Sequence, residues 1–119
     1  MDKIELQRRT KVFALNIYRL NDLFPKKSGN DVLAKQLLRS STSVAANYRA
    51  VCRAKSKADF INKLKIVEEE ADESLFWLEF IEEAEIFQKD HLKTLITEAN
   101  EFVAIFTSAL KTLRSNGNS

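Results

Sequence analysis

The sequence predicts an all-α protein, an up-down-up-down four-helix bundle. Apolar residues recur at helical spacing in four long segments. Gly occurs only twice and Pro once, too few for the many turns that a sheet protein needs. With 119 residues, 45% of them hydrophobic and 30% charged, the chain can bury one core, so we expect a single domain over residues 1–119.

The first helix is expected over residues 3–24, with Asp2 as its N-cap. Its apolar positions repeat every three or four residues and are Leu6, Phe13, Ile17, Leu20 and Phe24. Pro25 should end it, because the residue before a proline is biased away from the α region. The segment 25–30 then predicts a turn, since it holds the only Pro and one of the two Gly.

The second helix is expected over residues 31–54, with Asn30 or Asp31 as its cap. Its apolar stripe consists of Leu33, Leu37, Ser41, Val44, Tyr48 and Val51. Residues 40–47 are almost all small, which would let a neighbouring helix approach closely. Ser40, Ser43 and Asn47 are expected to be structural polar residues. For Asn47 the alternative is direct contact with a ligand, because an amide beside a core must find a partner.

The third and fourth helices are expected over residues 57–86 and 91–114. Ser56 and Asp59 resemble a capping box, and Asp90 is the expected N-cap of the fourth helix. The third segment carries one apolar stripe, consisting of Phe60, Leu64, Val67, Ala71, Leu75 and Leu78. It also carries a second, aromatic group on another side: Phe76, Trp77, Phe80 and Phe87. One bundle needs a single apolar stripe per helix, so the aromatic group predicts the interface of a homo-oligomer.

The residue inventory argues against an enzyme. His91 is the only histidine and Cys52 the only cysteine, whereas a di-iron bundle needs two Glu-x-x-His pairs and a zinc site needs several such ligands. Neither a P-loop nor G-x-G-x-x-G is present. We therefore expect no cofactor, no metal and no catalytic residue, unless a site forms between subunits.

Signals for secretion or membrane insertion are also missing from the sequence. Charged residues follow Met1 at once, and no apolar run approaches the length of a membrane span. A lone cysteine is compatible with a reducing compartment. The expected location is the cytoplasm.

Charge is distributed unevenly along the chain. Residues 1–65 hold 15 Lys or Arg against 5 Asp or Glu, while residues 66–119 hold 4 against 12. A basic stripe on the second helix and the turn after it fits a phosphate backbone, and consists of Lys35, Arg39, Arg49, Arg53, Lys55 and Lys57. The alternatives are a solvated face or ion pairs with the acidic third helix of a neighbouring subunit. No aromatic residue interleaves with this stripe, so base stacking is not expected.

The runs RSSTSVAANYR (residues 39–49) and SKADFINKLKIVEEEADESLFWLEF (residues 56–80) closely resemble the bacterial four-helix-bundle proteins encoded in 23S rRNA intervening sequences. The same superfamily includes the accessory variability protein of diversity-generating retroelements. The resemblance implies a ring-like homopentamer without known catalysis. For the retroelement branch it also implies a basic surface that binds nucleic acid and a reverse transcriptase.

The residues and the resemblance together predict a non-enzymatic, homo-oligomeric bundle that binds RNA or DNA or acts as an accessory scaffold. The alternative is a structural protein–protein interaction module that binds no nucleic acid.

Overall fold

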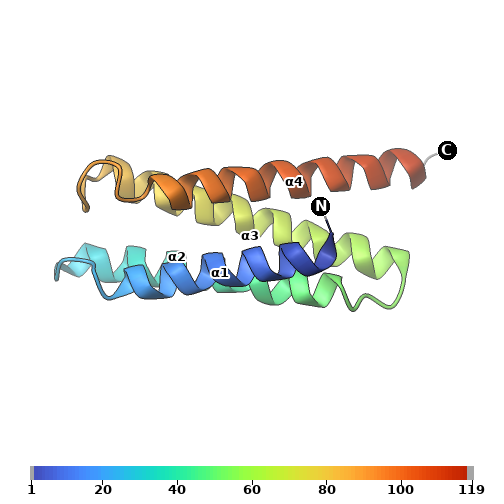
Figure 1. Cartoon of the computed structure of the whole chain (residues 1–119), viewed down its shortest axis with the longest axis horizontal. Helices are drawn as coiled ribbons and strands as arrows, with labels where there is room; N and C mark the ends of the chain where they lie inside the picture. Colours follow the sequence, from blue (N-terminus) through green and yellow to red (C-terminus); the bar gives the residue numbers. More distant parts are fainter. Residues whose placement is uncertain (1, 118–119) are drawn as a thin grey trace.

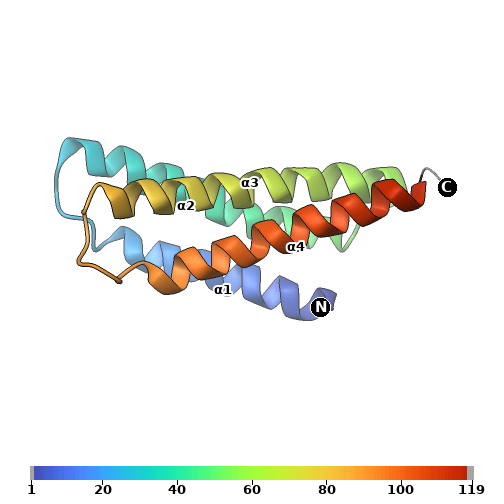
Figure 2. The ribbon, with the colours of Figure 1, turned by 90° about the horizontal axis from the view of Figure 1, so that it is seen from above.

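The computed structural model describes residues 2–117, and within them it contains four helices and no strand (Figure 1). The helices are α1 (Lys3–Asn21), α2 (Ser28–Val51), α3 (Lys57–Glu83) and α4 (Lys93–Gly117). The turns lie alternately at the two ends of the bundle, so consecutive helices run antiparallel and both chain ends lie at the same end (Figure 2). The expected all-α bundle is confirmed. In the described range, no helix is long and apolar enough to cross a membrane.

The core is built around aromatic rings from three helices. Phe13 of α1 meets Phe102 of α4 edge to face, with ring centroids 5.4 Å apart. Phe106 lies one turn further along α4 and contacts Tyr48 of α2 at 5.6 Å. Such pairs add to the stabilisation that comes from burying their area. The apolar positions predicted for α2 are buried as expected, apart from the half-buried Leu33.

Small residues join α2 to α3. Ser40 and Ser74 are fully buried, and their hydroxyl oxygens lie 2.9 Å apart. Each hydroxyl also bonds a carbonyl of its own helix, that of Leu37 or Glu70, so neither is left unsatisfied. The segment of small residues therefore does serve close packing, and at Ser40 the partner is α3.

An ion-pair cluster links α1 to α4. The Arg9 guanidinium donates to Glu98, with Nε 3.0 Å from Oε2, and to Glu101 at 3.2 Å. It also lies over the Phe102 ring, 5.3 Å from the centroid. Partial burial and two carboxylate partners make this a stronger contact than an ordinary surface pair.

The first two helix boundaries differ from the prediction. Asp2 caps α1 as expected, its carboxylate accepting from the Glu5 N–H at 2.8 Å, but α1 ends at Asn21, three residues before the predicted 24. The predicted caps of α2 are wrong, because the helix already begins at Ser28, with Lys27 as its N-cap. Asn30 lies inside the first turn, where its amide donates to the Pro25 carbonyl at 2.7 Å and fixes the preceding turn. The end of α2 is Val51, rather than the predicted 54.

The start of α3 follows the prediction. The Ser56 hydroxyl accepts from the Asp59 N–H at 3.1 Å, and Asp59 accepts in turn from the Lys55 N–H at 3.1 Å. This second bond goes to the residue before the cap, so the capping box is modified. A hydrogen bond from Lys63 and that backbone bond hold the pKa of the Asp59 carboxyl below its usual value.

The turn between α3 and α4 contains two residues with left-handed backbone. Glu85 has φ 56° and Asp90 has φ 71°. An N-cap needs an extended backbone, so Asp90 does not cap α4, contrary to the prediction. The fourth helix begins at Lys93, two residues after the predicted 91, and continues to Gly117, beyond the predicted 114. The third helix ends at Glu83, before the predicted 86.

Candidate nucleic-acid interface

An open groove runs between α1 and α2, with a volume of about 720 Å³. Four cationic side chains line it: Arg8 and Lys11 from α1, Arg49 from α2, and Arg53 from the turn directly after α2. The other lining residues are apolar or uncharged, with no carboxylate among the described ones: Gln7, Ala14, Leu15, Tyr18, Thr42, Ala45 and Ala46. We call this surface the basic groove.

The cations of the basic groove are available to a ligand. Among the described residues, no hydrogen bond or ion pair engages the side chain of Lys11, Arg49 or Arg53. Arg8 lies 3.9 Å from Glu5, and both side chains are exposed, which makes this a weak pair. Four positive charges around an uncharged floor create a local potential that attracts polyanions.

The predicted basic stripe does not form one surface. Arg39 turns toward α3 and pairs with Glu73 and, at 3.4 Å, with Glu70 of the same chain. Desolvation alone would lower the pKa of Arg39, but the hydrogen bond and charge of Glu73 and Glu70 outweigh it and raise the pKa, so the guanidinium stays charged. The positive charge of Arg39 is therefore largely compensated by two carboxylates of the same chain.

The remaining cations of the predicted stripe lie outside the basic groove. Lys35 is exposed on α2, and Lys55 and Lys57 lie at the turn into α3. Only Arg49 and Arg53 of the six predicted residues line the groove. The basic groove is therefore formed between α1 and α2, rather than by one face of α2 alone as predicted.

Arg8, Lys11 and Tyr18 were missed by the sequence reasoning. Together with Leu15 they are spaced three, four and three residues apart, so they share one face of α1. That spacing, with an aromatic residue away from the main apolar stripe, could have indicated from the sequence that these residues form a second surface on α1. No aromatic residue was expected within the stripe on the second helix, and the aromatic residue that lines the basic groove, Tyr18, comes from α1 instead.

The predicted structural polar residues make local hydrogen bonds. The Asn47 amide donates to the Ser43 carbonyl at 2.9 Å and to its hydroxyl at 2.8 Å, within one helix. Of these three predicted residues, only Ser40 shares a hydrogen bond with another helix, through Ser74 of α3. Nearby, burial, reinforced by the neighbouring Cys52, raises the pKa of Tyr48, which stays neutral.

The predicted interface aromatics fall into two groups. Phe76, Trp77 and Phe80 form a cluster on α3, with centroids 4.9 to 6.2 Å apart. Phe76 is 53% exposed and Phe80 is 45% exposed. Phe87 lies apart in the turn, half-buried against Phe24 at 5.0 Å and stacked on His91 at 5.0 Å. We call the first three residues the aromatic patch.

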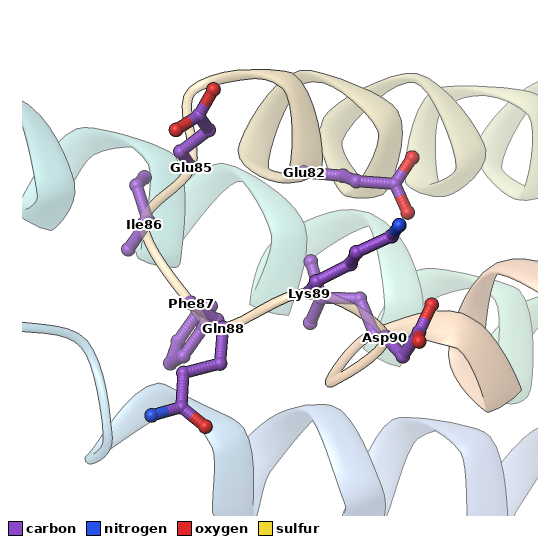
Figure 3. A pocket seen from close by; sticks show the side chains of 8 residues that line it. Glu82, Glu85, Ile86, Phe87, Gln88, Lys89 and Asp90 are labelled. Atoms are coloured by element: carbon purple, nitrogen blue, oxygen red, sulfur yellow. The ribbon is translucent and has the colours of Figure 1, made fainter.

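A second hollow lies at the turn between α3 and α4, where Glu82, Glu85 and Asp90 contribute carboxylates (Figure 3). Glu85 points away from the other two in this view. Within the described part of the chain, no group of three or more His, Cys, Asp or Glu residues could hold a metal ion. The hollow therefore offers no built site, and the basic groove is the candidate interface.

Comparison with known proteins places this fold in a family. The family model described as "23S rRNA-intervening sequence protein" matches residues 2–108. The chain belongs to the 23S rRNA-intervening sequence protein family. A crystal structure of a protein of unknown function from the S23 ribosomal protein family of Bacteroides thetaiotaomicron is similar to it, with 32% sequence identity and a TM-score of 0.83. The match covers 93% of this chain and 99% of that one.

No protein with curated annotation matches the chain. The resemblance seen in the sequence is thus confirmed for this member of the 23S rRNA-intervening sequence protein family, while its activity has to be argued from the groove and the patch.

Proposed function

We propose that this protein is a non-enzymatic, homo-oligomeric bundle that binds RNA or DNA in the cytoplasm through the basic groove. One observation carries the proposal: α1 and α2 bring four cations together around a floor without carboxylates. Phosphate contacts supply most of the affinity of sequence-independent nucleic-acid binding, and they need only positive charge at a matching spacing.

This proposal predicts a strong dependence on salt. If all four cations neutralise phosphates, log K should fall with log salt with a slope of about −3 to −4. Replacing Arg49 and Arg53 together by Glu should weaken binding more than tenfold and reduce the slope by about two units. Fluorescence anisotropy with labelled RNA and DNA at about 50 mM salt and above measures both quantities.

A matched control separates the groove from general charge. Lys93→Glu with Lys111→Glu makes the same change in net charge at two exposed positions of α4. This control should keep most of the affinity. An equal loss in both variants, or a wild-type protein that binds neither RNA nor DNA at low salt, would contradict the proposal.

Self-association is the second part of the proposal. The aromatic patch lies half in solvent, and acidic residues surround it on α3, namely Glu69, Asp72, Glu73, Glu79 and Glu83. Two such patches would repel each other if they met face to face, which disfavours a two-fold contact. Docking onto a different face of the next subunit is head-to-tail, and such a contact gives a ring when the rotation between subunits closes. Five members follow from the family resemblance alone.

The alternative is a protein–protein interaction module that binds no nucleic acid, with the basic groove receiving the acid-rimmed patch of a neighbour. The pairing of Arg39 with Glu70 and Glu73 favours this candidate, because it already joins basic α2 to acidic α3 within one chain. The Arg49→Glu, Arg53→Glu variant distinguishes the two. Loss of the oligomer would support the interaction module, whereas loss of nucleic-acid binding by an intact oligomer supports the proposed function.

A further inference from the structure

Tyr18 lines the basic groove, and its aromatic ring packs against no other ring in the described part of the bundle. The side chain is 62% exposed. Within the described residues it has no ring contact, no hydrogen bond and no ion pair. An exposed tyrosine that makes no such contact, in the same groove as four cations, supplies a stacking surface of the kind that single-strand binding proteins use.

The basic groove is polarised along its length. Because α1 and α2 run antiparallel, Arg8 and Lys11 lie beside Arg49 and Arg53 at one end, and Tyr18 lies beside Thr42 at the other. Small and apolar residues form the floor between these ends: Ala14, Leu15, Ala45 and Ala46. From residue 7 to residue 18 the groove spans roughly 16 Å at 1.5 Å per residue. That length spans several nucleotides, because a fully stacked strand rises about 3.4 Å per nucleotide.

We propose that the basic groove selects unpaired nucleotides, one base stacking on Tyr18 while the cations at the other end hold phosphates. This inference rests on the proposed function and narrows its ligand to single strands or single-stranded loops. The apolar floor suits the faces of unpaired bases and offers nothing to a phosphate. A duplex hides its base faces within its own stack, so it gains only the contribution of the cations.

The test compares strands with duplexes. Fluorescence anisotropy would measure binding of an unstructured oligo(U) RNA and an oligo(dT) DNA of about 12 nucleotides, and of RNA and DNA duplexes of the same length. Tyr18→Ala should weaken binding of both single strands by roughly 5- to 150-fold. The duplexes should be bound more weakly than the strands, with an affinity that the substitution leaves unchanged.

Two further variants make the result specific to the ring. Tyr18→Phe keeps the stacking face and should retain at least most of the affinity. Leu23→Ala removes an exposed apolar side chain from the turn directly after α1, outside the groove, and should change nothing. Zero-length ultraviolet cross-linking to oligo(U), followed by peptide mass spectrometry, should place the cross-link on the peptide that contains Tyr18.

The outcomes separate this inference from the function on which it rests. Equal affinity for strands and duplexes, or an unaffected Tyr18→Ala variant, overturns the single-strand preference while the sensitivity to Arg49→Glu and Arg53→Glu still supports nucleic-acid binding. Binding to none of the oligonucleotides overturns both. Capture of an acidic peptide or a second subunit in the groove, with no oligonucleotide bound, supports the interaction module instead.

Discussion

Two fully buried serines, Ser40 and Ser74, allow α2 and α3 to pack closely. Their side chains are small enough for two helices to meet there, and each hydroxyl keeps a partner within its own helix. The contributions of side-chain size and of hydrogen bonding to stability can be measured separately, because substitution by alanine removes the hydroxyl without adding volume.

Ser74→Leu should lower the free energy of unfolding by about 1–3 kcal/mol, since a larger side chain in a filled contact forces the helices apart. Ser74→Ala should cost no more than about 1 kcal/mol, because Ser40 retains its bond to the Leu37 carbonyl. Urea unfolding measures both. Ser108→Leu, at an exposed position of α4, is the control and should be nearly neutral. Equal costs for Leu and Ala at position 74 would rule out a packing limit.

At the same scale, the sequence predicted some site residues and missed others for a geometric reason. Arg49 and Arg53 could be found because they are four residues apart at the end of one periodic segment. The contributions of Arg8, Lys11 and Tyr18 depend on which faces of α1 and α2 meet, and helical periodicity does not determine that pairing. The ion pairs of Arg39 could not be predicted, because its carboxylate partners lie more than thirty positions away in the chain.

At the scale of the helix, Glu85 ends α3 in a motif that usually contains glycine. The N–H of Ile86 bonds the Ile81 carbonyl at 3.5 Å, and the N–H of Glu85 bonds the Glu82 carbonyl at 3.0 Å. These two bonds define a Schellman motif, whose left-handed residue is here Glu85 with φ 56°. A side chain at this backbone conformation carries a steric cost that glycine avoids.

Glu85→Gly should therefore raise the free energy of unfolding by up to about 1 kcal/mol, the relief of strain exceeding the added entropy of the unfolded chain. Glu79→Gly makes the same substitution in the interior of α3 and should destabilise by about 1 kcal/mol. Thermal and urea unfolding of the pair check the sign. A Glu85→Gly variant as destabilised as Glu79→Gly would mean that the left-handed turn is not maintained in solution.

Helix boundaries illustrate what local patterns can and cannot predict. Asp2 and Ser56 were recognised as caps because each is a short polar residue directly before a periodic segment. Asn30 and Asp90 fit the same pattern, but neither of them caps a helix. One is engaged by the Pro25 carbonyl, and the other adopts a left-handed turn. Both the hydrogen bond of Asn30 and the left-handed backbone of Asp90 depend on the turns that join the helices, which a helical pattern does not describe.

At the scale of the molecule, the bundle could be predicted because four amphipathic segments with short turns have few ways to bury their apolar faces. The basic groove and the aromatic patch could not be placed relative to each other, since each depends on how the helices are rotated about their axes. The structure puts the patch on α3 and the groove between α1 and α2. The two surfaces therefore lie on different helices of the bundle.

The aromatic patch leads to the last prediction, a homo-oligomer that depends on α3. Half-exposed Phe76 and Phe80 retain apolar area that docking would remove from water, each aromatic ring contributing up to about 150–250 Å². Phe76→Glu with Phe80→Glu adds charge to a surface that is already acidic, and should dissociate the assembly into 13.7 kDa monomers. Helicity should persist, because neither ring lies in the core.

Analytical ultracentrifugation and circular dichroism measure the two properties. The control is Ile4→Glu with Leu23→Glu, which places the same charges at exposed apolar positions of α1 and of the turn after it and should leave the assembly intact. A wild-type chain that sediments as a monomer at micromolar concentration would contradict self-association. An oligomer that survives the α3 substitutions would instead move the interface to another face, because two carboxylates cannot remain desolvated in an apolar contact without a partner.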